Sequence, residues 1–268
     1  MSKSKVVVIT GVSSGIGRVT ALLFAKQGFQ VFGTVRDVER ALLLPGVELI
    51  AMDIRQDHSV QLGIQSVIDK AGRIDVLVNN AGTTLVGAIE ETSIVEAQSL
   101  FDTNLFGMLR TIQAVLPHMR AQGHGRIVNV SSVLGFLPAP YMGLYSASKH
   151  AVEGLSESLD HEVRQFGIRV SLVEPSFTKT NLDLNAPVTV HQITDYQHER
   201  NLSSSAVVKS VQEAPAPDGV ANTIVKAGTG KWRMRHTPAG EATLLSRLRR
   251  FMPSGPVSAG IRKTFGLS

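Results

Sequence analysis

Tyr145 and Lys149 lie four residues apart in the stretch YMGLYSASKH, a spacing that could support proton transfer. On an α-helix, four positions are slightly more than one turn, so both side chains project from the same face. A lysine ammonium beside a phenol favours the phenolate and lowers the phenol's pKa from about 10 toward neutral pH. Such a tyrosine could exchange a proton with a substrate oxygen. The same spacing also arises by chance, so the rest of the chain must decide whether the pair forms a site.

A glycine-rich turn, TGVSSGIG at residues 10–17, stands between an apolar run and a helical pattern. Gly11 permits a tight exit from a strand, Gly15 allows close approach of a phosphate, and Gly17 lets a helix pack against a sheet. The N–H groups and partial positive charge at the start of that helix would face a pyrophosphate. We interpret the turn as a dinucleotide-binding site. A purely structural strand-to-helix turn is the alternative.

Short β-branched apolar runs alternate with longer helical patterns along the chain. This alternation predicts a parallel sheet with helices on both faces, within one domain that spans residues 1–268. The predicted strands are 6–10, 31–35, 47–52, 75–79, 126–130 and 168–173, and the helical patterns include 15–27, 57–71 and 93–121.

The segment 181–214, after the last of these strands, is polar and has little periodicity. Sheets of this kind bind ligands outside the carboxyl ends of their strands, and a long excursion at that edge could cover such a site. We therefore expect a substrate lid over 181–214, with a plain surface loop as the alternative.

The net charge of +5 is concentrated near the C-terminus, where residues 231–268 hold eight basic side chains and one acidic one. The rest of the chain is slightly acidic, which argues against a nucleic-acid-binding surface across the domain. Leu244, Leu245, Leu248 and Phe251 make the basic C-terminal extension, residues 236–268, amphipathic. The extension is expected to be a solvated face or to contact an acidic partner or an anionic membrane surface.

The chain has no cysteine, so disulfides and thiolate metal sites are excluded, and we predict no metal site. The apolar run near the N-terminus is too short for the core of an export signal. No run approaches the roughly 20 apolar residues that a membrane-spanning helix needs. A cytoplasmic location is therefore expected.

Several further motifs follow the glycine turn in a fixed order. They are Asp53 after the third predicted strand, NNAG at 79–82, Asn104, Ser132 and a proline-led turn at 175–180. Together with the glycine spacing and the tyrosine–lysine pair, this order resembles the short-chain dehydrogenase/reductase family over about residues 5–180. The resemblance implies a doubly wound Rossmann-type fold with a mainly parallel seven-stranded sheet. It also implies an oxidoreductase that transfers a hydride between a nicotinamide coenzyme and a carbonyl or secondary alcohol.

The resemblance further implies a catalytic set of Asn104, Ser132, Tyr145 and Lys149. Tyr145 would be the general acid/base, and Lys149 would hold the nicotinamide ribose hydroxyls. Ser132 would orient the substrate oxygen, whereas the adjacent Ser131 should point to the opposite side of an extended segment. Asn104 would help to hold a water in a proton relay that reaches Lys149.

Coenzyme contacts are implied in the turns that follow the strands. Asp53 would receive the adenine amino group, and Thr178 and Thr180 would meet the carboxamide. Ser176 stands where the family usually has glycine, so the geometry near the nicotinamide is expected to differ. The implied contacts are Gly11, Ser13, Ser14, Gly15, Ile16, Gly17, Arg36, Asp53, Ile54, Asn80, Ala81, Gly82, Tyr145, Lys149, Pro175, Thr178 and Thr180.

The residues after the second predicted strand bear on the choice of coenzyme. NAD-binding folds place a carboxylate here against the ribose 2′-hydroxyl, but Val35 fills that position and Arg36 follows it. A guanidinium suits a 2′-phosphate, so NADP is predicted over NAD, which is the alternative. Asp37 competes with this interpretation, although in the family this position usually faces the following loop. Ser14 stands where some relatives carry a second basic residue, which limits the expected discrimination.

The stretch 152–177 and the extended C-terminus resemble the steroid and retinol dehydrogenase branch, so a small-molecule carbonyl or alcohol is the expected substrate. Family members usually form homodimers or homotetramers through the helices at about 93–121 and 144–166. Two other classes share parts of the pattern. A nucleotide-sensing regulator of the same fold usually loses the tyrosine or lysine, and a sugar-nucleotide epimerase or dehydratase typically has a different glycine spacing.

Overall fold

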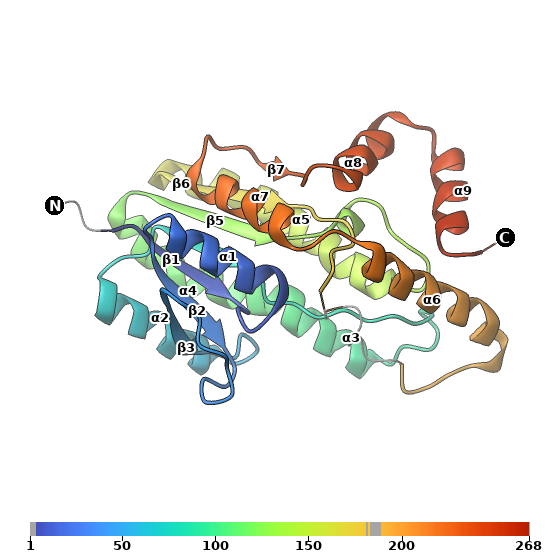
Figure 1. Ribbon diagram of the computed structural model, residues 1–268, viewed down its shortest axis with the longest axis horizontal. Coiled ribbons are helices and arrows are strands. Elements are labelled where there is room, and N and C mark those ends of the chain that lie inside the picture. Colours follow the sequence, from blue (N-terminus) through green and yellow to red (C-terminus); the bar gives the residue numbers. More distant parts are fainter. Residues whose placement is uncertain (1–3, 181, 183–188, 268) are drawn as a thin grey trace.

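The computed structural model describes residues 4–180, 182 and 189–267. Within this part of the chain, seven parallel strands form one sheet in the order β3-β2-β1-β4-β5-β6-β7 (Figure 1). The strands are β1 (Val6–Thr10), β2 (Gln30–Val35), β3 (Val47–Ala51), β4 (Val76–Asn79), β5 (Gly125–Val130), β6 (Ile168–Val173) and β7 (Arg235–His236). The predicted doubly wound, seven-stranded α/β fold is confirmed.

Helices cover both faces of the sheet (Figure 1). Helices α1 and α7 pack on one face, where Val7, Phe24 and Ile224 belong to one apolar core. Helices α2, α4 and α5 pack on the other face around Val8 and Ile112. Because side chains alternate along a strand, the neighbours Val7 and Val8 enter different cores. The helices are α1 (Gly15–Lys26), α2 (Asp57–Ala71), α3 (Ile94–Phe101), α4 (Gly107–Gln122), α5 (Gly143–Val163), α6 (Gln197–Glu213), α7 (Asp218–Thr229), α8 (Glu241–Phe251) and α9 (Ser254–Thr264).

The segment predicted as one helix over 93–121 is interrupted. Ser93 begins α3 with a capping box, in which its hydroxyl accepts from the Glu96 N–H and the Glu96 carboxylate accepts from the Ser93 N–H. Residues 102–106 then form a π-helical turn before α4 continues the segment. Such turns widen a helix locally and often occur at functional sites. Asn104 lies in this turn and is buried.

The predicted lid segment, 181–214, contains more regular structure than its sequence indicated, because α6 occupies half of it. Residues 181 and 183–188 lie outside the described part of the chain. Within α6, Ser203, Val207 and Val211 are buried at intervals of four residues. The buried Arg200 guanidinium forms an ion pair with the Glu91 carboxylate, which anchors α6 to the loop before α3. This tertiary packing stabilises a helix that local propensity only weakly favours.

Helices α8 and α9 make up most of the predicted C-terminal extension (Figure 1). The short α8 carries basic residues in its last turn, and α9 ends next to the buried side chains of Phe265 and Leu267. Along the described chain, none of the helices combines the length and apolar character that crossing a bilayer requires.

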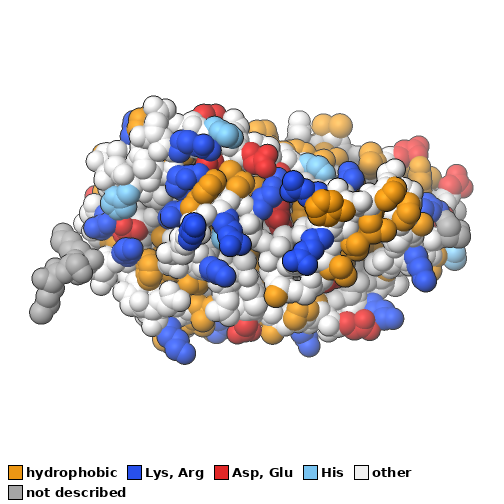
Figure 2. Space-filling view, turned by 90° about the horizontal axis from the view of Figure 1, so that it is seen from above, with side chains coloured by type: hydrophobic (Ala, Val, Ile, Leu, Met, Phe, Trp, Pro, Cys, Tyr) orange, Lys and Arg blue, Asp and Glu red, His pale blue; other side chains and the backbone are white. Residues whose placement is uncertain are grey.

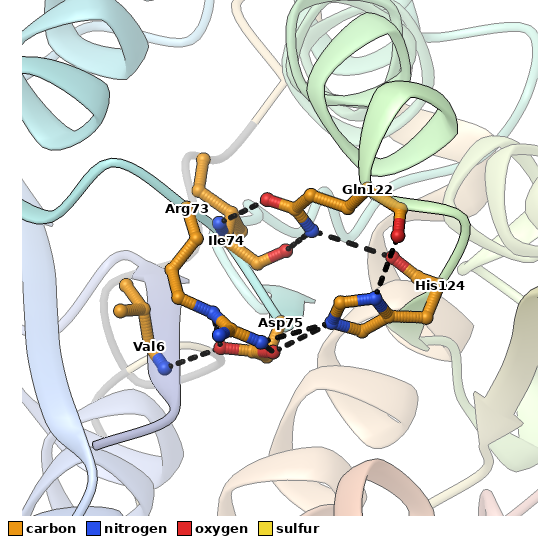
Figure 3. Close-up of polar contacts among 6 residues, drawn as sticks. All are labelled: Val6, Arg73, Ile74, Asp75, Gln122 and His124. Atoms are coloured by element: carbon orange, nitrogen blue, oxygen red, sulfur yellow. Dashed lines mark hydrogen bonds and ion pairs between the residues drawn. The ribbon is translucent and has the colours of Figure 1, made fainter. Parts of the chain in front are cut away.

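A polar network closes the amino-terminal end of the sheet (Figure 3). The buried Asp75 carboxylate accepts hydrogen bonds from the Val6 N–H at 2.8 Å and the Arg73 Nε–H at 2.9 Å. Its other oxygen contacts Nε2 of His124 at 2.9 Å. Burial alone would raise the pKa of the Asp75 carboxyl, but these hydrogen bonds lower it below its ordinary value. The network ties β1 and β4 to the turn before β5.

Replacing Asp75 with asparagine should lower the free energy of unfolding at pH 7 by about 2 kcal/mol, because a buried, hydrogen-bonded anion is lost. The pKa of the Asp75 carboxyl is lowered in the folded state. Its contribution to the free energy of unfolding is therefore present above the pKa of the unfolded state, and it is lost as the pH falls through the pKa of the folded state. The difference between wild type and variant should therefore narrow below about pH 4. Urea unfolding at several pH values measures both effects. As a control, Glu48→Gln removes an exposed pair with Lys70 and should cost under about 1 kcal/mol. Equal losses in the two variants would contradict this account.

Candidate active site

A cavity of about 550 Å³ lies at the carboxyl ends of the central strands. Its lining includes the turn after β1 and the segment after β4, the neighbouring strands between which the chain order reverses. Ligands of open α/β sheets bind at this position. The predicted site residues that line it are Gly11, Ser13, Ser14, Gly15, Ile16, Arg36, Asp53, Ile54, Asn80, Ala81, Gly82, Ser132, Tyr145, Lys149, Pro175, Thr178 and Thr180. The other two, Gly17 and Asn104, lie behind this lining.

The glycine turn has a backbone that other residues could not easily adopt or fit. Gly11 and Gly15 have φ values of +73° and +56°, in the left-handed region. A β-carbon on Gly17 would lie 2.3 Å from the Gly11 carbonyl oxygen and 2.4 Å from the Asn80 amide nitrogen. The start of α1 therefore approaches both the turn and the segment after β4 closely, and Gly15 and Ile16 in its first turn line the cavity. This cradle suits the phosphates of a dinucleotide.

The segment after β4 is held to the same turn by hydrogen bonds. The Asn80 amide donates to the carbonyls of Thr10 at 3.0 Å and Gly11 at 3.1 Å. The Thr10 hydroxyl accepts from the N–H groups of Asn80 and Ala81, both at 3.0 Å. Asn79 instead lies in the interior, where its amide donates to Asn129 at 2.9 Å. The NNAG motif thus combines one residue that links strands with neighbours that line the cavity.

Tyr145 and Lys149 come from the first two turns of α5, and both line the cavity although each is only 7% exposed. The Lys149 ammonium nitrogen lies 5.7 Å from the centre of the Tyr145 ring. It also donates to the Val130 carbonyl at the end of β5, at 3.0 Å. This bond fixes a long, flexible side chain beside the phenol.

Asn104 supports this region from behind the cavity wall. Its amide accepts from the Thr83 N–H at 2.8 Å and donates to the Thr83 carbonyl at 2.9 Å. It also donates to the Ser148 hydroxyl at 3.1 Å, which links the π-helical turn to α5. A β-carbon on Gly82 would lie 3.3 Å from the Asn104 amide oxygen and 4.0 Å from the Lys149 nitrogen. Gly82 thus leaves open space between Asn104 and the lysine.

The two neighbouring serines after β5 differ in their contacts. The Ser132 hydroxyl accepts from the Leu134 N–H at 3.1 Å and makes a long bond of 3.4 Å to the Pro175 carbonyl. The buried Ser131 hydroxyl has no hydrogen-bond partner among the described residues. A β-carbon on Gly135 would approach that hydroxyl to 2.7 Å. Both serines line the cavity, and Ser132 is the one that faces the Pro175 turn.

Arg36 and Asp37 lie at the edge of the cavity and differ in orientation. Arg36 is exposed and lines the cavity. The Asp37 carboxylate instead accepts from the N–H groups of Glu39 and Arg40, at 3.0 and 3.2 Å, and also pairs with the Arg40 side chain. Asp37 is therefore occupied by the loop that follows it, while the Arg36 guanidinium remains at the cavity.

Asp53, expected to receive the adenine amino group, also lines the cavity but has a partner that the sequence did not indicate. Both of its carboxylate oxygens accept from Arg55, at distances down to 2.6 Å. These bonds lower the pKa of the Asp53 carboxyl, although burial opposes them. Arg55 lines the cavity too, so this end of the site holds two cations, Arg36 and Arg55.

The turn that begins at Pro175 is held by a charge cluster behind it. The Arg235 side chain pairs with the carboxylates of Glu153, Glu157 and Glu174, which joins β7 to α5 and to the end of β6. Burial and the neighbouring Glu153 raise the pKa of Glu174 to about 7, against the opposing effect of Arg235. The Thr178 hydroxyl donates to the Ser176 carbonyl at 3.0 Å, within the turn itself.

The sequence motifs did not identify the apolar part of the lining. The part of it near Tyr145 includes Leu134, Met142 and Phe177, which come from three separate segments. Met142 belongs to the apolar cluster that also contains Tyr145 and the α6 residues Val207 and Val211, and Leu134 and Phe177 pack against this cluster. This apolar wall therefore lies on the Tyr145 side of the cavity.

Comparisons of sequence place this chain among known oxidoreductases. The family described as short chain dehydrogenase matches residues 5–189. The chain is 34% identical over 262 residues to 3-ketodihydrosphingosine reductase of Bacteroides thetaiotaomicron, a match that covers 96% of this chain and 97% of that protein. It is 36% identical to human 17-beta-hydroxysteroid dehydrogenase type 1 (97% and 86% covered) and 34% identical to bovine retinol dehydrogenase 8 (94% and 86%). The last two agree with the predicted steroid and retinol dehydrogenase branch.

Solved structures extend this likeness to the fold and the coenzyme. A short-chain dehydrogenase from Streptomyces avermitilis superposes with a TM-score of 0.83 at 33% identity, covering 100% of both chains. A Burkholderia phymatum protein solved with NAD has a TM-score of 0.80 at 26% identity (92% and 93% covered). A metagenomic short-chain oxidoreductase solved with NADP has a TM-score of 0.69 at 27% identity (90% and 100% covered). These neighbours support a nicotinamide coenzyme. This chain therefore belongs to the short-chain dehydrogenase/reductase family, and it is an oxidoreductase that acts on CH–OH or C=O groups.

Proposed function

We propose that the protein is an NADP(H)-dependent oxidoreductase that interconverts a carbonyl group and a secondary alcohol, with Tyr145 as general acid/base. The observation that carries this proposal is the position of Tyr145 and Lys149 at the wall of the cavity that also contains the glycine turn. A bound nicotinamide coenzyme would supply the hydride to the carbonyl carbon, or accept it in the reverse direction.

In this proposal, Tyr145 carries out the proton transfer. During reduction its hydroxyl donates a proton to the substrate oxygen, and during oxidation the phenolate takes the proton of the alcohol. The Lys149 ammonium stabilises the phenolate that donation leaves behind. The Ser132 hydroxyl gives up its long contact with the Pro175 carbonyl and donates to the same substrate oxygen.

In this proposal, Asn104 and Gly82 support the return of a proton to Tyr145 after it has donated one to the substrate. The amide of Asn104 is fixed by Thr83 and Ser148, and Gly82 leaves space between it and Lys149. We propose that a water held there passes a proton toward Lys149 and Tyr145 after each reduction. The buried amide thus acts as a positioning group rather than as a proton donor.

The substrate is proposed to be a small, largely apolar carbonyl compound or alcohol. Leu134, Met142 and Phe177 offer an apolar wall beside Tyr145, and the relatives' printed names include steroid, retinol and sphingoid-base enzymes. Mixing the protein with NADPH or NADH and a panel of ketones, aldehydes, steroids and retinal tests the proposal through loss of reduced-nicotinamide absorbance. Coenzyme binding without turnover on any of them would instead favour a nucleotide-sensing regulator.

The preference for NADP over NAD rests on the contrast between Arg36 and Asp37. A guanidinium at the cavity edge can pair with a 2′-phosphate. The adjacent Asp37 carboxylate, which would repel that phosphate, is turned into the following loop. Arg55 lies at the same end of the cavity, where its guanidinium pairs with the Asp53 carboxylate. NAD dependence is the alternative, in which the ribose hydroxyls alone are recognised.

Replacing Arg36 with aspartate should lower the ratio of kcat/KM for NADPH to that for NADH by about 10- to 100-fold, since a charge-assisted contact becomes a repulsion. Steady-state kinetics with both coenzymes measure the ratio. The matched control is Arg40→Asp, whose side chain is exposed and pairs with Asp37 outside the cavity. An unchanged ratio in Arg36→Asp would remove Arg36 as the phosphate-binding group, while leaving the reaction class untouched.

We also propose that residues 1–268 function as one domain that assembles into a homodimer or homotetramer. In support, Ile94, Val95 and Phe106 are exposed, at 73%, 74% and 47%, on α3 and the π-helical turn. An apolar surface of this kind on a helix is typical of a protein–protein contact.

A further inference from the structure

Two residues, Ala242 and Arg249, show which side of α8 faces the protein. Ala242 is only 1% exposed, and the Arg249 Nε–H donates to the Phe136 carbonyl at 3.2 Å. These contacts seat the helix on the loop that follows Val133–Gly135. The side of α8 that faces away from the protein can therefore be derived from its geometry.

That outer side is apolar. Each residue turns an α-helix by about 100°, so Phe251, nine positions after Ala242, lies on the opposite side of α8. Leu244, two positions after Ala242, is turned by about 200° and so lies on the same side as Phe251. Phe251 is 78% exposed and Leu244 is 56% exposed. A helix on the surface of a globular protein normally turns its apolar residues inward, so the exposed Leu244 and Phe251 depart from that arrangement.

Basic side chains accompany this apolar side. Arg247 lies between Leu244 and Phe251 in sequence and beside both on the helix surface. The Arg250 guanidinium carbon lies 5.9 Å from the centre of the Phe251 ring. Residues 241–264 contain five basic side chains and one acidic one. Figure 2 views the molecule from the side on which α8 and α9 lie, and there Lys and Arg side chains lie next to hydrophobic ones.

We propose that this α8 surface, formed by Leu244, Arg247, Arg250 and Phe251, docks on the surface of a bilayer that contains anionic lipids. Interfacial helices bury an apolar side at the level of the lipid headgroups, while flanking arginines pair with lipid phosphates. Charge complementarity therefore selects an anionic membrane, and the exposed Phe251 supplies the part that enters it. An acidic protein would satisfy the arginines but would not require an outward phenylalanine and leucine.

The position of α8 connects this surface to the cavity. Phe136, which accepts from Arg249, lies two residues after Leu134 in the apolar wall. Docking through α8 would therefore hold the cavity close to the bilayer. If the proposed function is correct, an apolar substrate dissolved in the membrane would have a short path to Tyr145. The docking itself does not depend on turnover.

Co-sedimentation of the full-length protein with vesicles tests the proposal. The protein should bind vesicles of phosphatidylcholine mixed with phosphatidylglycerol more tightly than vesicles of phosphatidylcholine alone, and added salt should weaken binding. Phe251→Ser and Arg250→Glu should each weaken binding to the anionic vesicles by about fivefold or more. Both positions are exposed, and far-UV circular dichroism checks that each variant is folded.

Matched controls separate a specific surface from general charge or apolar exposure. Leu62→Ser removes a leucine that is 58% exposed on α2, and Lys26→Glu reverses an exposed charge on α1. Both controls should bind anionic vesicles like the wild type. Absence of binding to anionic vesicles, or equal loss in controls and α8 variants, would overturn the proposal and would leave an acidic protein as the occupant to test. Because the assay needs no substrate, its failure is distinguishable from failure of the proposed reaction.

Discussion

Replacing Tyr145 with phenylalanine is expected to lower kcat about a thousandfold or more while leaving coenzyme affinity almost unchanged. The change removes one hydroxyl and retains the ring of a residue that is only 7% exposed and belongs to the apolar cluster beside the cavity. General acid/base catalysis typically contributes about 10²- to 10⁴-fold, and the substitution would also remove the phenolate that the Lys149 ammonium is proposed to stabilise. Coenzyme contacts from the glycine turn and the NNAG segment do not involve this hydroxyl.

The chain contains a matched control for this substitution. Tyr141 lies four residues before Tyr145, packs against the same apolar cluster and donates its hydroxyl to Glu199 at 3.3 Å, away from the cavity lining. Tyr141→Phe should therefore retain activity within about threefold, because a partly exposed hydrogen bond contributes little. Turnover is measured with a substrate identified in the panel, and coenzyme affinity by quenching of protein fluorescence. Retained activity in Tyr145→Phe would refute Tyr145 as the acid/base.

Much of the fold could be predicted because buried parallel strands have a local sequence pattern. The predicted strands 6–10 and 168–173 coincide with β1 and β6 residue for residue. Helix α6 could not be predicted in this way. Its serine run weakens helix propensity, and its anchor is the ion pair of Arg200 with Glu91, 109 residues earlier in the chain. An interaction across such a separation leaves no periodic pattern in the local sequence.

The site shows the same division between local and distant determinants. Turns after β1 and β4 could be predicted to meet because parallel strands end at one edge of the sheet. The apolar wall was missed, since Leu134, Met142 and Phe177 have no common spacing. The acceptor that holds Lys149 was missed for another reason. It is the main-chain carbonyl of Val130, and every residue has such a group. The π-helical turn at Asn104 also had no signal beyond an asparagine inside a helical pattern.

Gly17→Ala should weaken coenzyme binding by about a hundredfold, although alanine favours a helix more than glycine does. The new β-carbon would lie 2.3 Å from the Gly11 carbonyl oxygen and 2.4 Å from the Asn80 amide nitrogen. Neither atom can move freely, because Gly11 is main chain and the Asn80 amide already donates to two carbonyls. The start of α1 must therefore shift away from the turn, and a displacement of about 1 Å in a positioning element can cost about 10²-fold. Overpacking should also lower the free energy of unfolding by about 1–3 kcal/mol.

Gly219→Ala separates this steric effect from helix propensity. Gly219 lies in the first turn of α7, and no atom lies within 4 Å of the β-carbon that alanine would add there. That variant should keep wild-type coenzyme affinity and be slightly stabilised, because alanine in a helix is favoured over glycine by up to about 1 kcal/mol. Coenzyme affinity is measured by isothermal titration calorimetry, and stability by thermal unfolding without coenzyme. Equal affinity in Gly17→Ala and wild type would show that the close approach of α1 to the turn is not required for binding. Loss of affinity in both variants would point to a general sensitivity of the fold instead. Loss of coenzyme affinity in Gly17→Ala alone is the expected result. It would show that the coenzyme site requires a residue without a side chain at position 17.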